Sequence, residues 1–171
     1  MSYFNNFPTI MYDPTVDGSA KLATNIMKRD RMRANMKKEV VMMDSYDVKE
    51  NETPEIVSDK HHGSPYYHWV IMLLNDISDV NHDWVKSTRQ LQKYLLTKYT
   101  ETQLTETHHY EISQTSGDTT TKIEVENSTY PSAAAVTNYE YEVALNESKR
   151  KIDLLRNDYL GYFTDEFASL I

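Results

Sequence analysis

Residues 51–77, NETPEIVSDKHHGSPYYHWVIMLLNDI, contain two consecutive helix-start signals separated by one glycine. Thr53 suits an N-cap, and Pro54 suits the first helical position, where the missing N–H of proline leaves no hydrogen bond unmade. Gly63 can adopt the left-handed conformation that ends many helices. We therefore expect a short helix from Pro54 to about His62, followed by a tight turn.

The second signal, Ser64 followed by Pro65, begins a segment with a broad apolar face. Apolar residues recur there at helical spacing and predict a helix that is buried around most of its girth. Residues 40–48, VVMMDSYDV, predict a strand before the first helix. The order is therefore strand, short helix, turn and buried helix. The residues that we expect in the core of this module are Tyr67, Trp69, Val70 and Leu73.

The N-terminal flank of the module carries weaker patterns. Residues 1–18 are rich in aromatic residues and are interrupted by two prolines and Gly18, which predicts an extended arm. Residues 19–39 have a thin apolar stripe among many charges. This stripe predicts a helix that needs a partner surface.

In the C-terminal flank the spacing of the apolar residues changes twice. Ser87 and Gln90 form a capping-box signature and predict a helix. Residues 108–126 alternate between apolar and polar side chains and predict a β-hairpin. Such a hairpin is only marginally stable alone. Residues 127–136 are predicted to be a linker. From about Thr137 onward a long helix is predicted whose apolar stripe continues to the last residues, as in an element that docks in a groove.

Together these patterns predict an α+β protein in four segments. They are residues 1–43, an N-terminal arm and helix; residues 44–100, a core with its following helix; residues 101–136, a β-hairpin and linker; and residues 137–171, a docking helix.

Composition excludes several classes of function. The chain has no cysteine, which rules out disulfides, thiolate zinc sites and cysteine nucleophiles. Its net charge of -8 argues against a nucleic-acid partner, and we interpret the basic stretch 28–38 as a solvated helix face or a patch for an acidic protein. The longest apolar cluster, residues 69–74, is too short to span a bilayer, and the first residues do not resemble a signal peptide. We therefore expect no membrane partner and no secretion.

No side-chain pattern indicates catalysis or cofactor binding. Paired carboxylates cannot be identified, and the nucleophile elbow, the P-loop and the dinucleotide fingerprint are absent from the sequence. The six histidines lack the spacing of zinc ligands, and we interpret them as surface or hydrogen-bonding groups. We expect no catalytic residue, no metal and no cofactor. A metal-dependent hydrolase built on the histidines stays an alternative, which stoichiometric zinc in the purified protein would support.

The chain is rich in aromatic residues, with 13 tyrosines and 2 tryptophans. Such residues suit a sugar-stacking surface or a protein–protein interface. Apolar faces at both ends of the chain favour the second interpretation. The residues expected at interfaces are Tyr3, Phe4, Phe7 and Tyr12 in the N-terminal arm, Trp84 in a loop, and Tyr159, Phe163, Phe167 and Leu170 on the last helix.

The module at residues 46–77 resembles the LysM pattern. The matching positions are Thr53, Pro54, Ile56, Lys60, Gly63 and Asn75-Asp76-Ile77. More narrowly, the segment is similar to the gp53-like baseplate wedge proteins of contractile-tailed bacteriophages, through Pro65, Tyr67, Trp69, Val70, Asn75 and Asp83-Trp84. The opening YFNNFPTIMYD and the later YEVALNESKRKIDLL also resemble that family. After Ile77 the chain turns to Trp84 and a helix, where the LysM pattern has its second strand.

The resemblance implies a structural protein of the virion tail baseplate, assembled in the host cytoplasm. It implies six copies, one per wedge, which join neighbouring wedges and hold the inner ring around the hub. The implied partners are other baseplate wedge proteins, the wedge-core subunits and the lysozyme-like baseplate protein. The alternative implied by the LysM part alone is a carbohydrate-binding module that recognises peptidoglycan.

Overall fold

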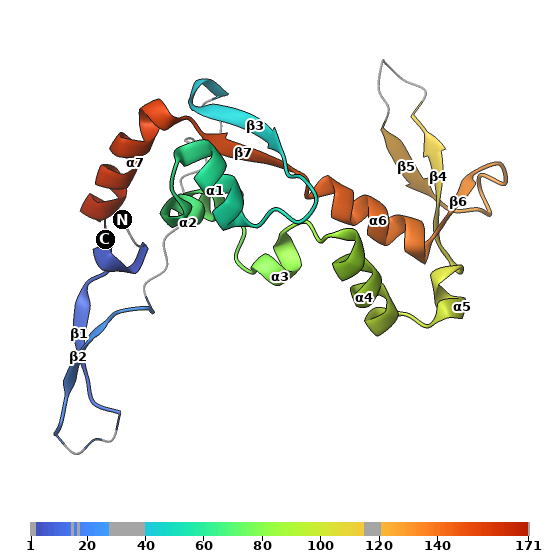
Figure 1. The fold of residues 1–171 in the computed structure, drawn as a ribbon. Helices are drawn as coiled ribbons and strands as arrows, with labels where there is room; N and C mark the ends of the chain where they lie inside the picture. The colour runs from blue at the N-terminus through green and yellow to red at the C-terminus, as the bar shows by residue number, and fades with distance from the viewer. Residues whose placement is uncertain (1–2, 15, 17, 28–39, 115–120, 171) are drawn as a thin grey trace. The chain divides into compact units, whose positions relative to one another are not determined.

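The computed structural model describes residues 3–14, 16, 18–27, 40–114 and 121–170. The chain divides into two compact units. Unit 1 comprises residues 1–84 and 151–171, and unit 2 comprises residues 85–150. Helices and small antiparallel sheets occur in both units, which confirms the predicted α+β class (Figure 1).

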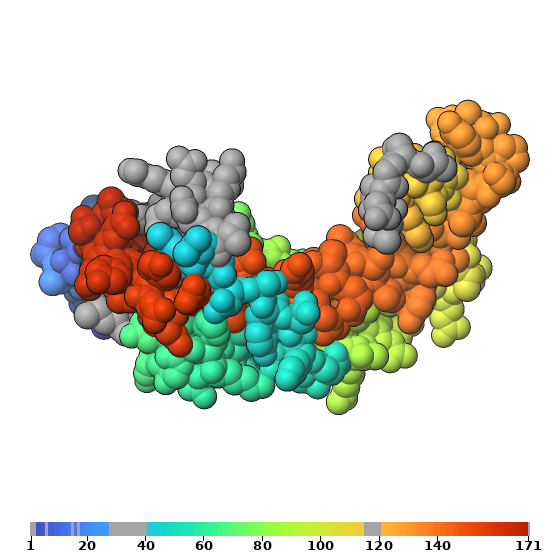
Figure 2. All heavy atoms as spheres, turned by 90° about the horizontal axis from the view of Figure 1, so that it is seen from above, coloured from blue at the N-terminus to red at the C-terminus, as the bar shows by residue number. Residues whose placement is uncertain are grey.

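Unit 1 is built on a strand–helix–helix–strand module. Strand β3 (Met43–Asp47) leads to α1 (Pro54–His62), and a 3-10 turn (Pro65–Tyr67) leads to α2 (His68–Leu74). The fourth element is β7 (Lys151–Leu155), which pairs antiparallel with β3 (Figure 1). In the space-filling view the cyan residues of β3 lie beside the red residues of the C-terminal segment (Figure 2).

The predicted helix signals are confirmed. Thr53 is the N-cap of α1, and its Oγ1 accepts a hydrogen bond from the Ile56 N–H at 3.4 Å. Gly63 ends the helix in the left-handed conformation, with φ of 70°. Because this conformation strains a residue with a side chain, glycine fits the turn best. Ser64 then caps the 3-10 turn that opens the second helix.

The long helix predicted from Thr137 to the C-terminus is wrong. The structure has α6 (Asn138–Ser148), strand β7 and α7 (Asn157–Leu170) in its place. Ile152 and Leu154 are buried on either side of the exposed Asp153, which is the alternation of a strand. Since β3 needs an antiparallel partner to satisfy its backbone groups, tertiary pairing determines the structure of this segment.

The side chain of Asn75 fastens β7 to the end of α2. Its Oδ1 accepts a hydrogen bond from the Asp153 N–H at 2.9 Å, and its Nδ2 donates to the Asp153 carbonyl at 2.8 Å. Asn75 thereby supplies the two hydrogen bonds that a neighbouring strand residue would supply. The same residue is the C-cap of α2.

The N-terminal arm forms a hairpin. A 3-10 turn (Tyr3–Asn6) precedes β1 (Thr9–Tyr12), which pairs antiparallel with β2 (Lys21–Thr24). The helix predicted for residues 19–39 is therefore wrong at β2, and residues 28–39 lie outside the described ranges. The Asp13 carboxylate accepts hydrogen bonds from the N–H groups of Val16 and Gly18, at 2.8 and 2.9 Å. These hydrogen bonds stabilise the turn after which the chain returns antiparallel as β2.

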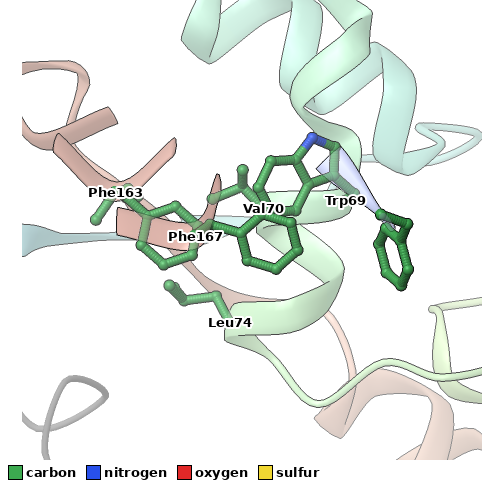
Figure 3. Close-up of a cluster of buried hydrophobic side chains, with 7 residues drawn as sticks. Trp69, Val70, Leu74, Phe163 and Phe167 are labelled. Carbon is green, nitrogen blue, oxygen red and sulfur yellow. The ribbon is translucent and has the colours of Figure 1, made fainter. Parts of the chain in front are cut away.

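The hydrophobic core of unit 1 is formed by α2, β7, α7 and the N-terminal arm. Figure 3 shows the rings of Phe163 and Phe167 directed from α7 toward the face of α2 that carries Trp69, Val70 and Leu74. The Phe167 ring centroid lies 4.6 Å from that of Trp69. The full cluster is Phe7, Trp69, Val70, Leu74, Leu155, Phe163 and Phe167, with Tyr67 and Leu73 packed against it.

Unit 2 begins with α4 (Thr88–Lys98), whose capping box between Ser87 and Gln90 is confirmed. The short helix α5 (Glu101–Leu104) follows. The predicted hairpin is present as β4 (Thr107–Ser113) and β5 (Lys122–Val125). The predicted linker contains a third strand, β6 (Ala134–Thr137), which pairs with the other edge of β4, so the sheet order is β5-β4-β6. In unit 1 a short helix, α3 (Val80–Asp83), precedes Trp84.

Within the described ranges, no helix combines the length and apolar character needed to cross a bilayer.

Candidate functional site

The N-terminal hairpin exposes apolar side chains on both of its faces. Met11 and Leu22 are opposite each other in the register and are 67% and 69% exposed. Ile10 and Tyr12 lie on the other face, because side chains alternate along a strand, and both are exposed as well. An isolated two-stranded ribbon is marginally stable in water, so these faces are suited to burial against another surface.

The residues next to the hairpin extend this exposed surface. The exposed large apolar residues of the N-terminal region are Phe4, Ile10, Met11, Tyr12, Val16, Leu22, Ile26 and Met27. Several exposed apolar residues within one element mark interaction sites in proteins, whereas single exposed apolar residues do not. The hairpin is therefore the strongest candidate for a protein-binding element in the described part of unit 1.

The structure separates the nine predicted interface residues into three groups by their exposure. Phe4, Tyr12 and Leu170 are exposed. Tyr3 and Tyr159 are half-buried and pack against the hydrophobic cluster, and the four remaining residues are fully buried in unit 1. These four are Phe7, Trp84, Phe163 and Phe167.

The apolar face of the last helix is therefore internal. Phe163 and Phe167 pack on α2, and the Tyr3 ring is stacked on Phe167 with centroids 5.6 Å apart. The sequence pattern detects an apolar face but not the element that covers it, and here the cover comes from the same chain. The exposed Leu22 is missed by the sequence prediction because residues 19–39 predict a helix, and the exposed Met11 is missed because only aromatic residues of the arm are expected at interfaces.

Trp84 is 5% exposed, although it follows a short surface helix. Its Nε1–H donates a hydrogen bond to the Glu52 carbonyl at 2.8 Å. The Glu52 carboxylate is itself buried and accepts hydrogen bonds from the Tyr46 hydroxyl, the Lys49 N–H and Lys60. Burial alone raises the pKa of Glu52, but these hydrogen bonds outweigh it and hold that pKa below its usual value. Trp84 is therefore held inside the module by the segment that connects β3 to α1.

Two histidines join the end of α1 to the start of α7. His61 Nε2 lies 3.1 Å from the Leu155 carbonyl oxygen. The Asn157 Nδ2 donates to the His61 carbonyl, which leaves Asn157 Oδ1 as the acceptor for His62 Nδ1 at 2.9 Å. His62 is therefore the Nδ1–H tautomer, and its Nε2 is buried without a hydrogen-bond partner. These are the hydrogen-bonding roles that the sequence favoured over metal binding.

We expect the His62 contact to make unit 1 less stable at mildly acidic pH. Burial lowers the pKa of His62, so as pH falls below about 6.5 the unfolded chain binds a proton before the folded chain does. The free energy of unfolding then decreases with decreasing pH. Urea denaturation of the wild type and of His62→Gln between about pH 7 and pH 5.5 should show a smaller decrease in the variant. Equal decreases in the two proteins would contradict this assignment.

Unit 2 is held together by buried polar groups. The Asn146 side chain accepts from the Lys86 N–H at 2.8 Å and donates to the Lys86 carbonyl at 3.0 Å, which ties α6 to the start of the unit. Glu142 is 3% exposed and accepts hydrogen bonds from Lys98 and from the Tyr99 hydroxyl. The hydrogen bond to Glu142 raises the pKa of Lys98. No pattern in the sequence indicates these contacts, because their partners are far apart in the chain.

Among the residues that the structure describes, no cluster of three or more His, Asp or Glu side chains is arranged to hold a metal ion. His82 pairs with Asp79 three residues earlier, and His109 pairs with Glu111, both at hydrogen-bond distance.

Comparison with known protein families matches the chain to the model of base plate wedge protein 53 over residues 3–131. The match covers 129 of the 171 residues, and β7 and α7 lie beyond it. A search of curated proteins finds no match. The matched region includes the exposed hairpin, the helices α1, α2 and α3 and the strands β4 and β5. With three quarters of its length matched, this chain belongs to the phage base plate wedge protein 53 family.

Proposed function

We propose that this protein is a structural component of the phage tail baseplate wedge, which joins neighbouring wedges and holds the inner ring around the hub through protein–protein contacts. The observation that carries the proposal is the N-terminal hairpin, whose two faces are both apolar and exposed. The family supports a baseplate role. Binding energy, rather than catalysis, is then the mechanism.

The partners in this proposal are other baseplate wedge proteins, including the wedge-core subunits and the lysozyme-like baseplate protein, with six copies of the chain per baseplate. The chain would be assembled into the virion in the host cytoplasm. We assign the Met11 and Leu22 face of the hairpin to such a wedge partner, with Phe4 and Leu170 as further exposed contacts. The four interface residues that are buried in unit 1 would instead stabilise the fold from which the hairpin extends.

We also propose that the module of β3, α1, α2 and β7 is a LysM-like domain. The strand–helix–helix–strand order and the antiparallel pairing of β3 with β7 support this assignment. In this interpretation unit 2 is inserted before the second LysM strand, which explains why that strand does not directly follow Ile77 in the sequence.

Carbohydrate binding by this module is the less favoured function. Sugar stacking needs exposed aromatic rings, and both tryptophans, Trp69 and Trp84, are only 5% exposed. Saturable retention of the purified chain on peptidoglycan would favour that alternative.

A complementation experiment tests the wedge proposal. The double variant Met11→Asp/Leu22→Asp places two charges on one hairpin face without touching the core of unit 1. Expressed in cells infected by a phage that lacks the gene, it should lower the yield of infectious particles at least about tenfold, because two apolar contacts of about 1.5–3 kcal/mol are lost. Leu96→Asp, which places a charge on an exposed apolar position of α4 outside the hairpin, is the control and should complement fully. Full complementation by the double variant would overturn the assignment.

A further inference from the structure

Unit 2 has very little apolar core of its own. Of its described residues, 85–114 and 121–150, the buried apolar ones are Val85 and Leu95. No described residue of the sheet β5-β4-β6 is fully buried. Natural domains of fewer than about 70–80 residues often supplement a small core with disulfides or with a bound metal ion. Because the chain has no cysteine, a metal ion is the one of these two supplements that unit 2 can use.

An irregularity in strand β4 brings two consecutive histidines together. The pairing of β4 with β6 passes from Thr107 to His109 while β6 advances by a single residue, so His108 is an extra residue in β4. Consecutive side chains of a regular strand point to opposite faces of the sheet, and a bulge of this kind redirects one of them. As a result, the Nδ1 atoms of His108 and His109 lie 2.8 Å apart.

The surrounding side chains hold both imidazole rings in this arrangement. The His109 Nε2 lies 3.0 Å from Oε1 of Glu111, and the same carboxylate forms an ion pair with Lys122 of β5. The ring of His108 is stacked on the ring of Tyr141 from α6, with centroids 3.9 Å apart and planes inclined by 9°. A carboxylate that accepts a hydrogen bond from the far nitrogen of a histidine is the usual support of a metal-binding imidazole, because it fixes the ring and raises its basicity.

The hydrogen-bond partners determine where the protons of the two rings are. An ionised carboxylate only accepts hydrogen bonds, so neutral His109 carries its proton on Nε2, toward Glu111, and its Nδ1 has a free lone pair. The proton between the two Nδ1 atoms therefore belongs to His108. The His108 side chain is exposed, so this proton can move to its Nε2 by exchange with water. Two Nδ1 lone pairs then converge on one point, and the net charge of the pair is unchanged.

We propose that the Nδ1 atoms of His108 and His109 bind one divalent transition-metal ion of the class that prefers imidazole ligands, such as Zn²⁺, with water in the remaining positions. Two nitrogens on a tetrahedral zinc ion are about 3.3 Å apart, so the two rings need to separate by only about 0.5 Å. The ion would fix the bulge of β4, and an ion that binds only the folded chain stabilises it. This site is independent of the proposed wedge function and goes beyond it.

Titration of the full-length chain, without a histidine tag, with Zn²⁺ tests the site. Because the site has half the protein ligands of a structural zinc site, calorimetry should give one ion per chain with a Kd between about 1 μM and about 200 μM. In nitrogen-15 spectra of the imidazole rings, the resonances of His108 and His109 should shift as Zn²⁺ is added. Those of the other consecutive pair, His61 and His62, should not shift, because each of these rings is already engaged in a contact within unit 1.

Two single variants separate this site from general binding of zinc to surface histidines. His108→Gln changes an exposed position and should weaken zinc binding at least about tenfold, because one of the two ligands is lost. His82→Gln is the matched control, since His82 is also exposed and also lies beside a carboxylate, and it should change the Kd less than about twofold. Circular dichroism shows that the variants keep the fold of the wild type. The proposal would be overturned by a wild type that binds no Zn²⁺ at about 1 mM, the weak limit of specific binding, or by equal zinc affinities of the two variants.

Discussion

A chain that ends after Arg150 will lose the tertiary structure of unit 1, although it keeps β3, α1 and α2. The truncation removes β7, the antiparallel partner of β3, and α7, which covers α2. It also removes the buried side chains of Ile152, Leu154, Leu155, Phe163 and Phe167. Each contributes about 1.5–3 kcal/mol, so their sum of about 7–15 kcal/mol equals the whole stability of an ordinary domain.

Near-ultraviolet circular dichroism measures this effect, because Trp69 and Trp84 are both buried in unit 1. The truncated chain should lose the tryptophan signal. A chain that ends after Ser169 is the control, since it keeps Phe163 and Phe167, and it should retain the signal. A native tryptophan spectrum in the chain that ends after Arg150 would show that unit 1 folds without its last strand. The family match ends before this strand, so the experiment also shows whether the matched region is a folding unit.

Replacing Phe167 by alanine should lower the free energy of unfolding of unit 1 by about 3–5 kcal/mol, the usual cost of deleting a buried aromatic ring. The ring is 6% exposed and contacts both Trp69 and Tyr3. Its loss would therefore leave a cavity between α7, α2 and the N-terminal arm. Urea denaturation followed by tryptophan fluorescence measures the change.

Tyr162→Ala is the matched control for this substitution. Tyr162 is an aromatic residue on the same helix, but it is 78% exposed. Its replacement should change the free energy of unfolding by less than about 0.5 kcal/mol. If Phe167→Ala and Tyr162→Ala had equal effects, α7 would be a peripheral helix, as expected for an element that awaits a partner.

The sequence predicted the elements that short-range chemistry determines. Thr53, Pro54 and Gly63 fix the ends of α1, and Ser87 with Gln90 fixes the start of α4, because each signal acts within four residues. The core positions of Trp69 and Val70 follow from helical spacing. The β4–β5 hairpin is predicted by the alternation of apolar and polar residues along its two strands.

The elements that depend on distant partners could not be predicted. Strand β7 pairs with β3 across more than 100 residues, and β6 pairs with β4 across a segment that reads as a linker. Trp84 is buried because a carbonyl 32 residues earlier accepts its N–H. In each case the local pattern is compatible with two structures, and the distant contact selects one. The same reason explains the interface residues that proved to be internal, since an apolar stripe does not specify which surface covers it.

Hydrogen exchange of the hairpin amides tests the central claim most directly. The claim is that Thr9–Tyr12 and Lys21–Thr24 form a docking element that is covered in the baseplate. Exchange in the free chain should be fast for these strands and slow for β3 and β7, because open ribbons protect their amides poorly. In baseplates purified from the phage that carries the chain, the hairpin amides should become protected. Hairpin amides that exchange equally fast in the free chain and in the baseplate would contradict the account.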